Sequence, residues 1–339
     1  MNIAINGFGR IGRAAFQIIL DKYAKVGLNV VAINDLTDTA TLAHLFQYDT
    51  TAGKLDQKIK GIKDYLLVGG TKYRVLAEKD PSQLPWKELK VDVVLECTGR
   101  FRTKEEAALH LQAGAKKVII SAPAKGDEGV ATIVLGVNEN TLKKNDNIIS
   151  CASCTTNCLA PVTEMIRSQF GIKKSFISTV HAYTADQNLV DGPHKDLRRA
   201  RAAAANIVPT TTGAAKAIGK TIPSLKGKVD GLAIRVPVLV GSLVDVVYLL
   251  NKRTDAAKVN KAFSSFAKTS KYKDIVEVSS DPLVSSDIIG NPHSAIIDTE
   301  YTTVIDGDFL KVLAWYDNEW GYSNRLADLC FYLQKKKYI

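Results

Sequence analysis

Three cysteines stand close together near the middle of the chain, in the segment SCASCTTNC at residues 150–158. The apolar pair at residues 148–149 is typical of a short strand, whereas the apolar residues from Leu159 to Ile166 recur at helical spacing. Cys154 therefore lies where a strand gives way to the start of a helix. Backbone amides and the helix dipole stabilise a thiolate at such a position, so the sequence predicts a lowered thiol pKa and a nucleophilic cysteine.

Two other chemistries use cysteines at this spacing. Cys151 and Cys154 have the C-x-x-C spacing of redox motifs, and Cys158 adds a third soft ligand for zinc. A structural zinc site needs four ligands, and the sequence has no second C-x-x-C or close H-x-x-x-H. A thioredoxin-like motif, in turn, belongs to a much shorter domain. We therefore expect no metal site, and buried, unreactive cysteines remain the plainer alternative to a nucleophile.

A cysteine nucleophile needs a base or an imidazolium partner. His181 follows an alternating apolar run, residues 176–180, at the end of a predicted strand. A histidine in that context is often only a core residue, but the other four histidines stand in less defined contexts. His181 is thus the leading candidate for the partner of Cys154.

The N-terminus carries a glycine pattern that binds pyrophosphate in many proteins. Gly7, Gly9 and Gly12 form G-x-G-x-x-G directly after a short apolar run, and helical spacing follows. Such glycines permit a tight turn, a close approach of the backbone to a pyrophosphate, and close packing of helix against strand. Asp35 ends the next predicted strand, where an acid binds a ribose hydroxyl and repels the extra phosphate of NADP. An ordinary turn is the alternative, but the full pattern predicts NAD.

Anion-binding patterns occur in the second half of the chain. Lys and Arg number 45 against 35 acidic residues, a formal net charge of +10 that calls for an anionic partner. The hydroxyl run at residues 210–212 leads into a helical pattern, which is typical of an anion cradle. Arg235 lies within an apolar strand, so it needs a carboxylate or a bound phosphate. Arg198, Arg199 and Arg201 form a cluster, for which a solvated face is the plainer interpretation.

The order of predicted elements indicates an α/β protein, and 339 residues exceed the usual size of a single hydrophobic core. In the first half, short apolar runs alternate with helical patterns, which predicts a parallel, Rossmann-type sheet. These runs are residues 2–6, 29–35, 91–97, 117–121 and 147–150. After about residue 150 the runs are longer and have fewer helices between them, which predicts a catalytic α+β domain with a mixed or antiparallel sheet. These runs are residues 175–183, 229–236, 242–251, 295–305 and 309–316.

Three further features narrow the class of protein. Residues 185–205 carry many charges without a sustained period, which predicts a long functional loop. The most apolar window, residues 231–250, contains Arg235 and Asp245, so we expect strands there and no membrane span. The five cysteines form a poor disulfide framework and no signal-peptide pattern opens the chain, so we expect a cytoplasmic protein.

Over essentially its full length the chain resembles the phosphorylating, NAD-dependent glyceraldehyde-3-phosphate dehydrogenases of glycolysis. Six motifs occur in the order in which the family has them, and the second is highly specific. They are INGFGRIGR (5–13), ASCTTNCLAP (152–161), HAYTADQ (181–187), LRRARAAA (197–204), PTTTGAAKA (209–217) and WYDNEWGYSNR (315–325). The resemblance implies a Rossmann domain for NAD at residues 1–152, completed by a C-terminal helix at about 320–339, and a catalytic domain at residues 153–319.

The resemblance also implies roles for individual residues. Cys154 is the nucleophile, His181 activates it, Asp35 binds the adenosine ribose, and Asn318 holds the nicotinamide amide. The implied cofactor-binding residues are Gly7, Gly9, Arg10, Ile11, Gly12, Asp35, Lys79, Ser121 and Asn318. Two phosphate pockets, one for the substrate's own phosphate and one for inorganic phosphate, are implied at Ser153, Thr155, Thr184, Arg199, Thr212, Gly213 and Arg235.

The implied reaction converts D-glyceraldehyde 3-phosphate to 1,3-bisphosphoglycerate. Cys154 attacks the aldehyde, His181 takes the hydroxyl proton of the hemithioacetal as hydride leaves for NAD, and inorganic phosphate cleaves the thioester. The family further implies a homotetramer, in which the loop at 185–205 reaches a neighbouring subunit. Erythrose-4-phosphate dehydrogenase, in which water replaces phosphate, shares nearly every motif and is the alternative. RNA or surface binding remains open as a secondary activity.

The sequence departs from the family pattern at three places. Cys151 replaces the usual Asn, and Val238 follows the RVP motif where Thr is usual. Neither change removes a catalytic group, but the segment Val238–Ser242 is expected to alter packing or a subunit contact beside Arg235. Ala52 stands where a His is common, and the sequence offers no explanation for that change.

Overall fold

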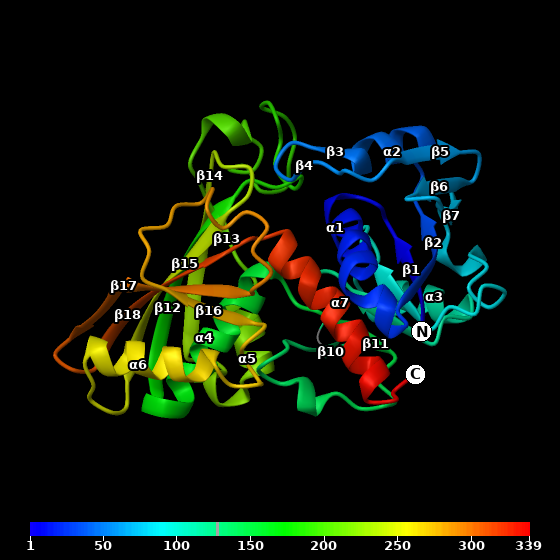
Figure 1. Ribbon diagram of the computed structural model, residues 1–339. Coiled ribbons are helices and arrows are strands. Elements are labelled where there is room, and N and C mark those ends of the chain that lie inside the picture. The colour runs from blue at the N-terminus through cyan, green and yellow to red at the C-terminus, as the bar shows by residue number, and fades with distance from the viewer. Residues whose placement is uncertain (127–128) are drawn as a thin grey trace. The chain divides into compact units, whose positions relative to one another are not determined.

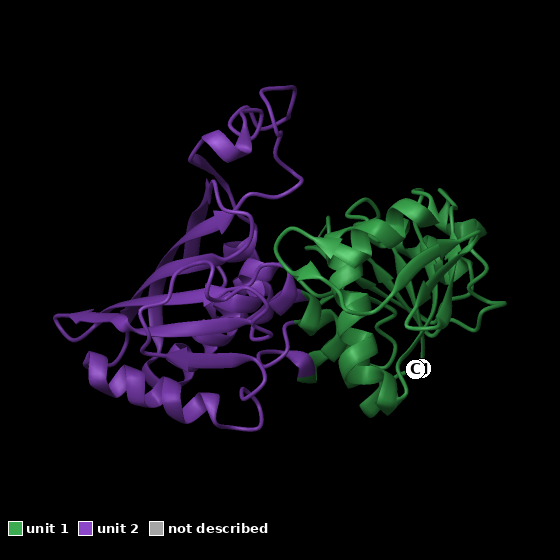
Figure 2. Ribbon diagram, turned by 45° about the horizontal axis from the view of Figure 1, so that its top comes forward, with its two compact units in different colours: residues 1–133, 140–152, 323–339 green, residues 134–139, 153–322 purple. Residues whose placement is uncertain are grey.

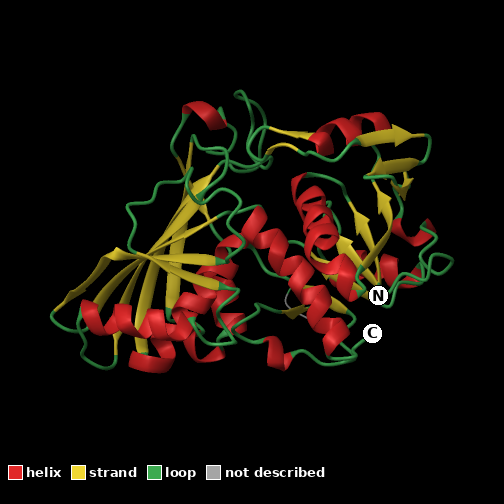
Figure 3. Cartoon of the chain, in the orientation of Figure 1, coloured by secondary structure: helices red, strands yellow, loops and turns green. Residues whose placement is uncertain are grey.

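The computed structural model describes residues 1–126 and 129–339 (Figure 1). The chain divides into two compact units, which Figure 2 shows in separate colours. The first consists of Met1–Ile133, Asn140–Ala152 and Ser323–Ile339, and the second of Val134–Glu139 and Ser153–Tyr322. Strands and helices are mixed in each unit (Figure 3), in agreement with the predicted α/β class.

The first unit is built on a sheet of nine strands within the described residues, in the order β10-β11-β9-β8-β1-β2-β7-β6-β5. Neighbours from β10 to β7 are parallel, whereas β6 is antiparallel to both β7 and β5. The strands are β1 (Asn2–Asn6), β2 (Asn29–Asn34), β5 (Ile59–Ile62), β6 (Tyr65–Val68), β7 (Thr71–Leu76), β8 (Val93–Glu96), β9 (Lys117–Ile120), β10 (Ala131–Thr132) and β11 (Ile148–Ser150). The predicted parallel, Rossmann-type sheet is confirmed, with ends that differ by at most two residues.

The antiparallel edge of this sheet, β5 to β7, is not predicted by the sequence. Its strands are short, glycine and lysine interrupt them, and no apolar alternation is sustained. Two turns with left-handed backbone form the edge: Lys63 has φ 48°, and Gly69 and Gly70 have φ 54° and 88°. A separate small hairpin pairs β3 (Tyr48–Asp49) with β4 (Gly53–Lys54).

The helices of the first unit follow local capping signals. The predicted capping box opens α3 (Lys104–Gln112): Thr103 Oγ1 accepts a hydrogen bond from the backbone N–H of Glu106, and the Glu106 carboxylate accepts one from Thr103 N–H. The other helices are α1 (Arg10–Ile18), α2 (Thr39–Gln47) and most of α7 (Trp320–Lys335). Short helical turns are η1 (Ile19–Tyr23), η2 (Ala24–Val26), η3 (Pro81–Gln83) and η4 (Glu139–Thr141).

The second unit holds a mixed sheet of seven strands within the described residues, in the order β13-β14-β12-β15-β18-β17-β16. The pairs β14/β12 and β17/β16 are parallel and the others antiparallel. The strands are β12 (Ile172–Ala182), β13 (Val208–Thr211), β14 (Val229–Val236), β15 (Ser242–Leu250), β16 (Val276–Ser279), β17 (Ala295–Ile305) and β18 (Phe309–Tyr316). This confirms the predicted mixed sheet; β13 and β16 are additional to it.

Three helices cover one face of the mixed sheet (Figure 1). They are α4 (Cys154–Phe170), α5 (Ala214–Thr221) and α6 (Ala256–Ala267), and two short turns, η5 (Ala203–Ala205) and η6 (Pro223–Leu225), lie in the connections. α4 packs across β12, β15, β17 and β18. Alternate residues of β15 are buried, which is the pattern of a sheet with one covered face. The packing of α4 on β12 brings Cys154 near the end of the strand that carries His181.

Candidate active site and cofactor cradle

The glycine loop of the first unit has the backbone geometry that its pattern predicts. Gly7 has φ 92°, and a Cβ there would lie 2.8 Å from the backbone nitrogen of Thr98. A Cβ at Gly12 would lie 2.1 Å from the Gly7 oxygen, so only glycine lets α1 pack this closely on β1. A Cβ at Gly9 would meet nothing within 4 Å. The loop therefore leaves open space at its centre.

The N-terminus of α1 carries no side chain that would compete with a bound anion. Its N-cap residue is Gly9, no side chain caps it, and no acidic residue lies in its first turn. The first amides of a helix carry a partial positive charge and need acceptors. The loop and the helix start thus fit a dinucleotide pyrophosphate, which supplies such acceptors.

Asp35 lies just after β2 and its carboxylate is held in place by backbone donors. It accepts hydrogen bonds from Phe8 N–H at 2.7 Å and from Thr37 N–H at 3.0 Å. The carboxylate is therefore oriented beside the glycine loop while its residue remains partly exposed. This placement fits the predicted contact with a ribose hydroxyl.

A buried polar network lies beneath this loop. Asn6 donates to Glu96 at 2.6 Å, and His110 contacts the same carboxylate at 3.1 Å. Asn34 donates to Asn6 and is itself tied to the backbone of Glu78 by two hydrogen bonds. The network links the carboxyl ends of β1, β2 and β8, the edge at which a parallel sheet of this kind binds its ligand.

The remaining predicted cofactor residues of the first unit occupy varied positions. Arg10 forms an ion pair with Asp49 at 2.7 Å and also donates to Thr51. Ile11 lies in the first turn of α1, Lys79 is exposed, and the Ser121 N–H donates to the Glu96 carbonyl. The cofactor-binding roles of these four residues remain predictions.

In the second unit, Cys154 is the first residue of α4. Ser153 is the N-cap: its Oγ accepts a hydrogen bond from the backbone N–H of Thr156 at 3.1 Å. Ala152, directly before the cap, has φ 56°, a left-handed backbone that is costly for alanine. The thiol is thus placed at a sharp turn between β11 and α4, as the sequence predicts.

Cys154 and His181 lie within contact distance. Sγ of Cys154 is 3.4 Å from Nε2 of His181. On the far side of the ring, Nδ1 is 2.7 Å from the Ala182 carbonyl oxygen and 2.7 Å from Nη1 of Arg235. The Ala182 carbonyl can only accept and Arg235 can only donate, so Nδ1 lies against one acceptor and one donor. In the tautomer with its proton on Nδ1, the carbonyl accepts that proton and Nε2 is bare toward the thiol. Arg235 then donates to the same carbonyl at 2.9 Å.

The electrostatics of this pair correct one expectation. Burial raises the pKa of the Cys154 thiol, although the positive charge of Arg235 and the Thr155 backbone N–H oppose that shift. The predicted lowering of the thiol pKa is therefore wrong, because desolvation outweighs the helix terminus. Burial and the nearby Arg235 lower the pKa of His181 to about 3. At neutral pH the imidazole is uncharged and able to accept a proton.

The other cysteines are unsuited to reaction. Burial raises the pKa of Cys151 and of Cys97 to about 12, and that of Cys158 well above its usual value. Cys151 and Cys158 are at most 1% exposed. All five cysteines are free. Among them, Cys154 alone contacts a histidine through a hydrogen bond measured in the described residues.

Two arginines converge near the thiol. Arg235 is paired across the sheet with His181, and the charge of Arg199 contributes to lowering the pKa of Arg235, so the two guanidinium groups lie in each other's field. Nε of Arg235 is buried and has no hydrogen-bond partner among the described residues. Arg199 pairs with Asp186 and donates to Thr210 Oγ1 at 2.9 Å. A buried donor without an acceptor fits a bound anion.

The other residues predicted to bind phosphate differ in whether they lie at an open helix start. Gly213 is the N-cap of α5, a Cβ there would meet nothing within 4 Å, and the neighbouring Thr212 hydroxyl accepts from Ala214 N–H. This helix start is open to an anion. Thr155, by contrast, is buried and its hydroxyl bonds to the Tyr316 hydroxyl at 2.9 Å. Thr184 is partly exposed, just beyond β12.

Sequence reasoning misses two residues behind the thiol and the imidazole. The hydroxyl of Tyr316 bonds to both Thr155 and Thr179, each at 2.9 Å, and its ring meets that of His181 edge-on at 5.8 Å. Thr179 lies on the same face of β12 as His181 because the two are two residues apart, and this spacing is the sequence signal that could have found Thr179. The pairing of Tyr316 with them depends on strand order and has no sequence signal.

Asn318, the predicted nicotinamide ligand, follows β18. Its Oδ1 accepts a hydrogen bond from Gly241 N–H at 3.1 Å and one from the Ser242 hydroxyl at 3.0 Å. Asn318 is 5% exposed. The segment Val238–Ser242, where the sequence departs from its family, thus ends in direct contact with this amide.

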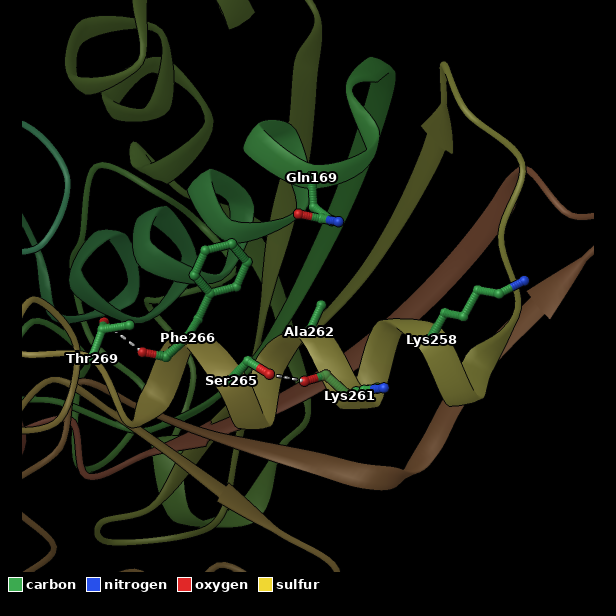
Figure 4. Close-up of a pocket in the computed structure, with 7 residues that line it drawn as sticks. All are labelled: Gln169, Lys258, Lys261, Ala262, Ser265, Phe266 and Thr269. Atoms are coloured by element: carbon green, nitrogen blue, oxygen red, sulfur yellow. Dashed lines mark hydrogen bonds between the residues drawn. The ribbon is translucent and has the colours of Figure 1, made fainter.

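A surface pocket of about 490 Å³ lies elsewhere in the second unit, between α6 and the end of α4 (Figure 4). Gln169, Lys258 and Phe266 are among its lining residues. The hydroxyls of Ser265 and Thr269 bond back to carbonyls of their own segment. Since the pocket contains none of the predicted site residues, we do not assign chemistry to it.

In the described part of the chain, every helix is too short or too polar to span a membrane. No three or more His, Cys, Asp or Glu side chains come together there in a way that would hold a metal ion.

Comparisons with known proteins agree along the whole chain. Residues 1–104 match the model of the glyceraldehyde 3-phosphate dehydrogenase NAD binding domain, and residues 153–318 match that of the C-terminal domain of the same enzymes. The chain is 51% identical to a glyceraldehyde-3-phosphate dehydrogenase of Streptomyces coelicolor, with 98% of both chains covered. It is 53% identical to the corresponding proteins of Mycobacterium bovis and Mycobacterium tuberculosis, with 97% of each chain covered.

Proposed function

The chain belongs to the glyceraldehyde-3-phosphate dehydrogenase family, and we propose that it converts D-glyceraldehyde 3-phosphate and inorganic phosphate to 1,3-bisphosphoglycerate in glycolysis. It is an NAD-dependent oxidoreductase that acts on an aldehyde group. The observation that carries the finer proposal is the contact of Cys154 Sγ with a neutral His181, 3.4 Å apart, in the field of two arginines.

Bond formation starts at Cys154. Its sulfur forms a bond to the aldehyde carbon while the thiol proton passes to Nε2 of His181. The aldehyde oxygen then takes that proton and becomes the hydroxyl of a hemithioacetal. A neutral imidazole beside a protonated thiol is the starting state that the pKa directions support, since both groups are uncharged when buried.

His181 acts a second time in the oxidation. NAD, when bound, supplies the acceptor for the hydride that leaves the substrate carbon. His181 Nε2 takes the hydroxyl proton as the carbonyl of the thioester forms. A phosphate oxygen then attacks that carbonyl, and the thiolate of Cys154 leaves as the acyl phosphate is released. The thiolate takes back the proton held by His181, and the proton of the attacking phosphate passes to solvent. The Ala182 carbonyl supports the imidazolium form because it accepts a hydrogen bond from Nδ1.

The arginines hold the anions. Arg235 offers a buried, unpartnered Nε, and Arg199 brings a second positive charge close to it. The open start of α5 at Gly213 offers further donors. We propose that these groups bind the phosphate of the substrate and the attacking phosphate. We propose that Thr155 supports this phosphate site indirectly, because its hydroxyl is hydrogen-bonded to that of Tyr316.

The NAD assignment fits the first unit. Its uncapped helix start, open glycine loop and oriented Asp35 carboxylate fit a dinucleotide pyrophosphate and an adenosine ribose. We propose that Arg10, Ile11, Lys79 and Ser121 line the same ligand and that Asn318 of the second unit binds the nicotinamide amide.

The test is NADH formation from glyceraldehyde 3-phosphate and NAD, with and without inorganic phosphate. Parallel reactions contain NADP or erythrose 4-phosphate. We expect fast turnover that requires phosphate and strongly prefers NAD. A single burst followed by slow release that is independent of phosphate would instead indicate hydrolysis of the acyl-enzyme, and the proposed reaction would be wrong.

We also propose a cytoplasmic homotetramer. Several apolar side chains in and beside the loop at 185–205 are strongly exposed in the single chain, among them Leu189 and Leu197, each 81% exposed. Such a cluster is typical of a surface that another protein covers. The five free cysteines fit a reducing compartment.

A further inference from the structure

Ser242 connects two parts of the candidate site that lie on different strands. It is the first residue of β15, is 1% exposed, and is paired across the sheet with Tyr316 of β18. Its Oγ lies 3.1 Å from the Ala182 nitrogen and 3.0 Å from Oδ1 of Asn318. Neither sequence patterns nor the proposed mechanism uses this hydroxyl.

The direction of each hydrogen bond follows from the groups involved. The backbone N–H of Ala182 can only donate, so Ser242 Oγ accepts that bond and directs its own proton to Asn318. The Gly241 N–H can also only donate, so the atom of Asn318 that receives it is the oxygen and not the amide nitrogen. Two donors therefore hold Oδ1, and the NH₂ end of the amide must face the other way.

That NH₂ end is available. No hydrogen-bond partner of Asn318 Nδ2 is found among the described residues, although the residue is 95% buried. The amide thus presents two donors and no acceptor to its open side. A carboxamide ligand would be recognised there through its oxygen.

The backbone at Gly241 reinforces this arrangement. Gly241 has φ 98°, and a Cβ there would lie 2.3 Å from the Ser285 carbonyl oxygen. Only glycine can follow this path, which aims the Gly241 N–H at Asn318. The segment Val238–Ser242, which departs from the family pattern, therefore ends in a turn that places Gly241 N–H and the Ser242 hydroxyl against Asn318.

The other bond of Ser242 reaches the catalytic histidine. Ala182 donates its backbone N–H to Ser242 Oγ, while its carbonyl oxygen lies 2.7 Å from Nδ1 of His181 and accepts a hydrogen bond from Arg235. A shift of Ser242 would therefore be felt at both the imidazole and the Asn318 amide.

We propose that Ser242 is a positioning residue that sets the orientation of the Asn318 amide, so that only its NH₂ end meets the nicotinamide carboxamide. The consequence is that one face of the nicotinamide ring is directed at the substrate carbon. This inference rests on the proposed binding of NAD by Asn318. It adds a residue whose hydroxyl touches neither cofactor nor substrate.

The experiment compares binding of NAD with binding of ADP-ribose, which lacks the nicotinamide, by calorimetry of the full-length protein. For Ser242→Ala we expect a three- to tenfold weaker affinity for NAD and an unchanged affinity for ADP-ribose. Ser175→Ala is the matched control, because Ser175 is a buried serine of the same sheet whose hydroxyl bonds only to the Val247 carbonyl in the described residues. It should bind both ligands as the unsubstituted protein does.

A double-mutant cycle tests the route through Asn318. Asn318→Asp keeps the acceptor oxygens and removes both N–H donors, so it should weaken NAD selectively. Ser242→Ala should then cause no further loss in the Asn318→Asp background. With deuterated substrate, Ser242→Ala should also place measurable deuterium on the wrong face of the NADH ring.

Four outcomes decide the matter. Equal losses for NAD and ADP-ribose in Ser242→Ala would reduce the residue to a general structural role and overturn the inference, as would additive losses in the cycle. An unchanged NAD affinity together with unchanged stereochemistry would also overturn it. Failure of the unsubstituted protein to bind NAD would contradict the proposed function itself, which separates the two failures.

Discussion

At the scale of single residues, the site depends on two groups that burial keeps uncharged. Desolvation raises the pKa of Cys154 and lowers that of His181, while Arg235 lowers both. Arg235 therefore favours the thiolate and disfavours the imidazolium, so it sets where the proton of the pair resides. In the proposed mechanism the thiol becomes reactive because its proton has an acceptor at 3.4 Å, and not because it is ionised in advance.

Substituting the two cysteines of the C-x-x-C separately tests the single nucleophile. Cys154→Ser should lower kcat by about 10³-fold or more, because the attacking sulfur is lost, while NAD binding stays measurable. Cys151→Ser should be nearly silent, since Cys151 is 1% exposed and its thiol pKa is about 12. Steady-state kinetics and NAD titration provide the readouts. Equal losses in both variants would contradict the assignment.

Replacing His181 distinguishes its role in proton transfer from the accessibility of the Cys154 thiol. His181→Asn should slow the hydride step by about 10²–10⁴-fold, because the acceptor for the hydroxyl proton is gone. Labelling of Cys154 by iodoacetamide should still proceed to completion. Single-turnover formation of NADH measures the step, and mass spectrometry of the labelled peptide provides the control. An unchanged single-turnover rate would remove His181 from the mechanism.

The charge of Arg235 leads to a prediction about the pH dependence of Cys154 and His181. In Arg235→Gln the positive charge that lowers both pKa values is absent, so both should rise. The alkylation rate of Cys154 should then increase at a higher pH than in the unsubstituted protein. The titration of His181, followed by NMR of labelled histidine, should move upward from about 3 toward its ordinary value. A shift of either group to lower pH would refute this account of the field.

At the scale of elements, the sequence specifies what local patterns control. Strand ends, the capping box of α3 and the placement of Cys154 at the start of α4 follow from nearest-neighbour chemistry, and the structure agrees with them. Cross-strand register is different, because it depends on partners far away in sequence. The contact of Ser242 with Asn318 arises from the register of β15 on β18, and the contact of Tyr316 with Thr155 arises from the packing of α4 on β18. No local pattern reveals either.

The thiol pKa likewise depends on one local feature and on contacts with residues distant in sequence. A helix terminus can be read from the sequence, and so the sequence predicts a lowered pKa at Cys154. Desolvation of the thiol cannot be read in this way, and it is the larger effect. The roles of the cofactor and phosphate residues remain predictions for the experiments above.

The packing of α1 on β1 gives a prediction at this scale. Gly12→Ala would place a methyl group 2.1 Å from the Gly7 carbonyl, so helix and loop must separate. We expect a loss of about 1–3 kcal/mol in stability and a strong loss of NAD affinity. Chemical denaturation and calorimetry measure the two effects. Gly9→Ala is the control: it has open space at its Cβ, so the fold should tolerate it. Equal destabilisation of both variants would argue against the packing account.

At the scale of the whole molecule, each unit carries one part of the chemistry. The first unit holds the glycine loop and Asp35, and the second holds the thiol, the imidazole and the arginines. The net charge of +10 fits a chain that binds the anionic dinucleotide NAD and that we propose to bind two phosphates as well.

The loop at 185–205 supports the last prediction, which concerns assembly. Leu189 and Leu197 are each 81% exposed in a single chain, which is unfavourable in water unless another subunit covers them. Light scattering should therefore give a mass four times that of one chain. Leu189→Asp combined with Leu197→Asp should yield smaller species, because buried carboxylates would oppose association. Val284→Asp, at an apolar residue 56% exposed outside the loop, should leave the mass unchanged. A monomeric unsubstituted protein at micromolar concentration would refute the tetramer.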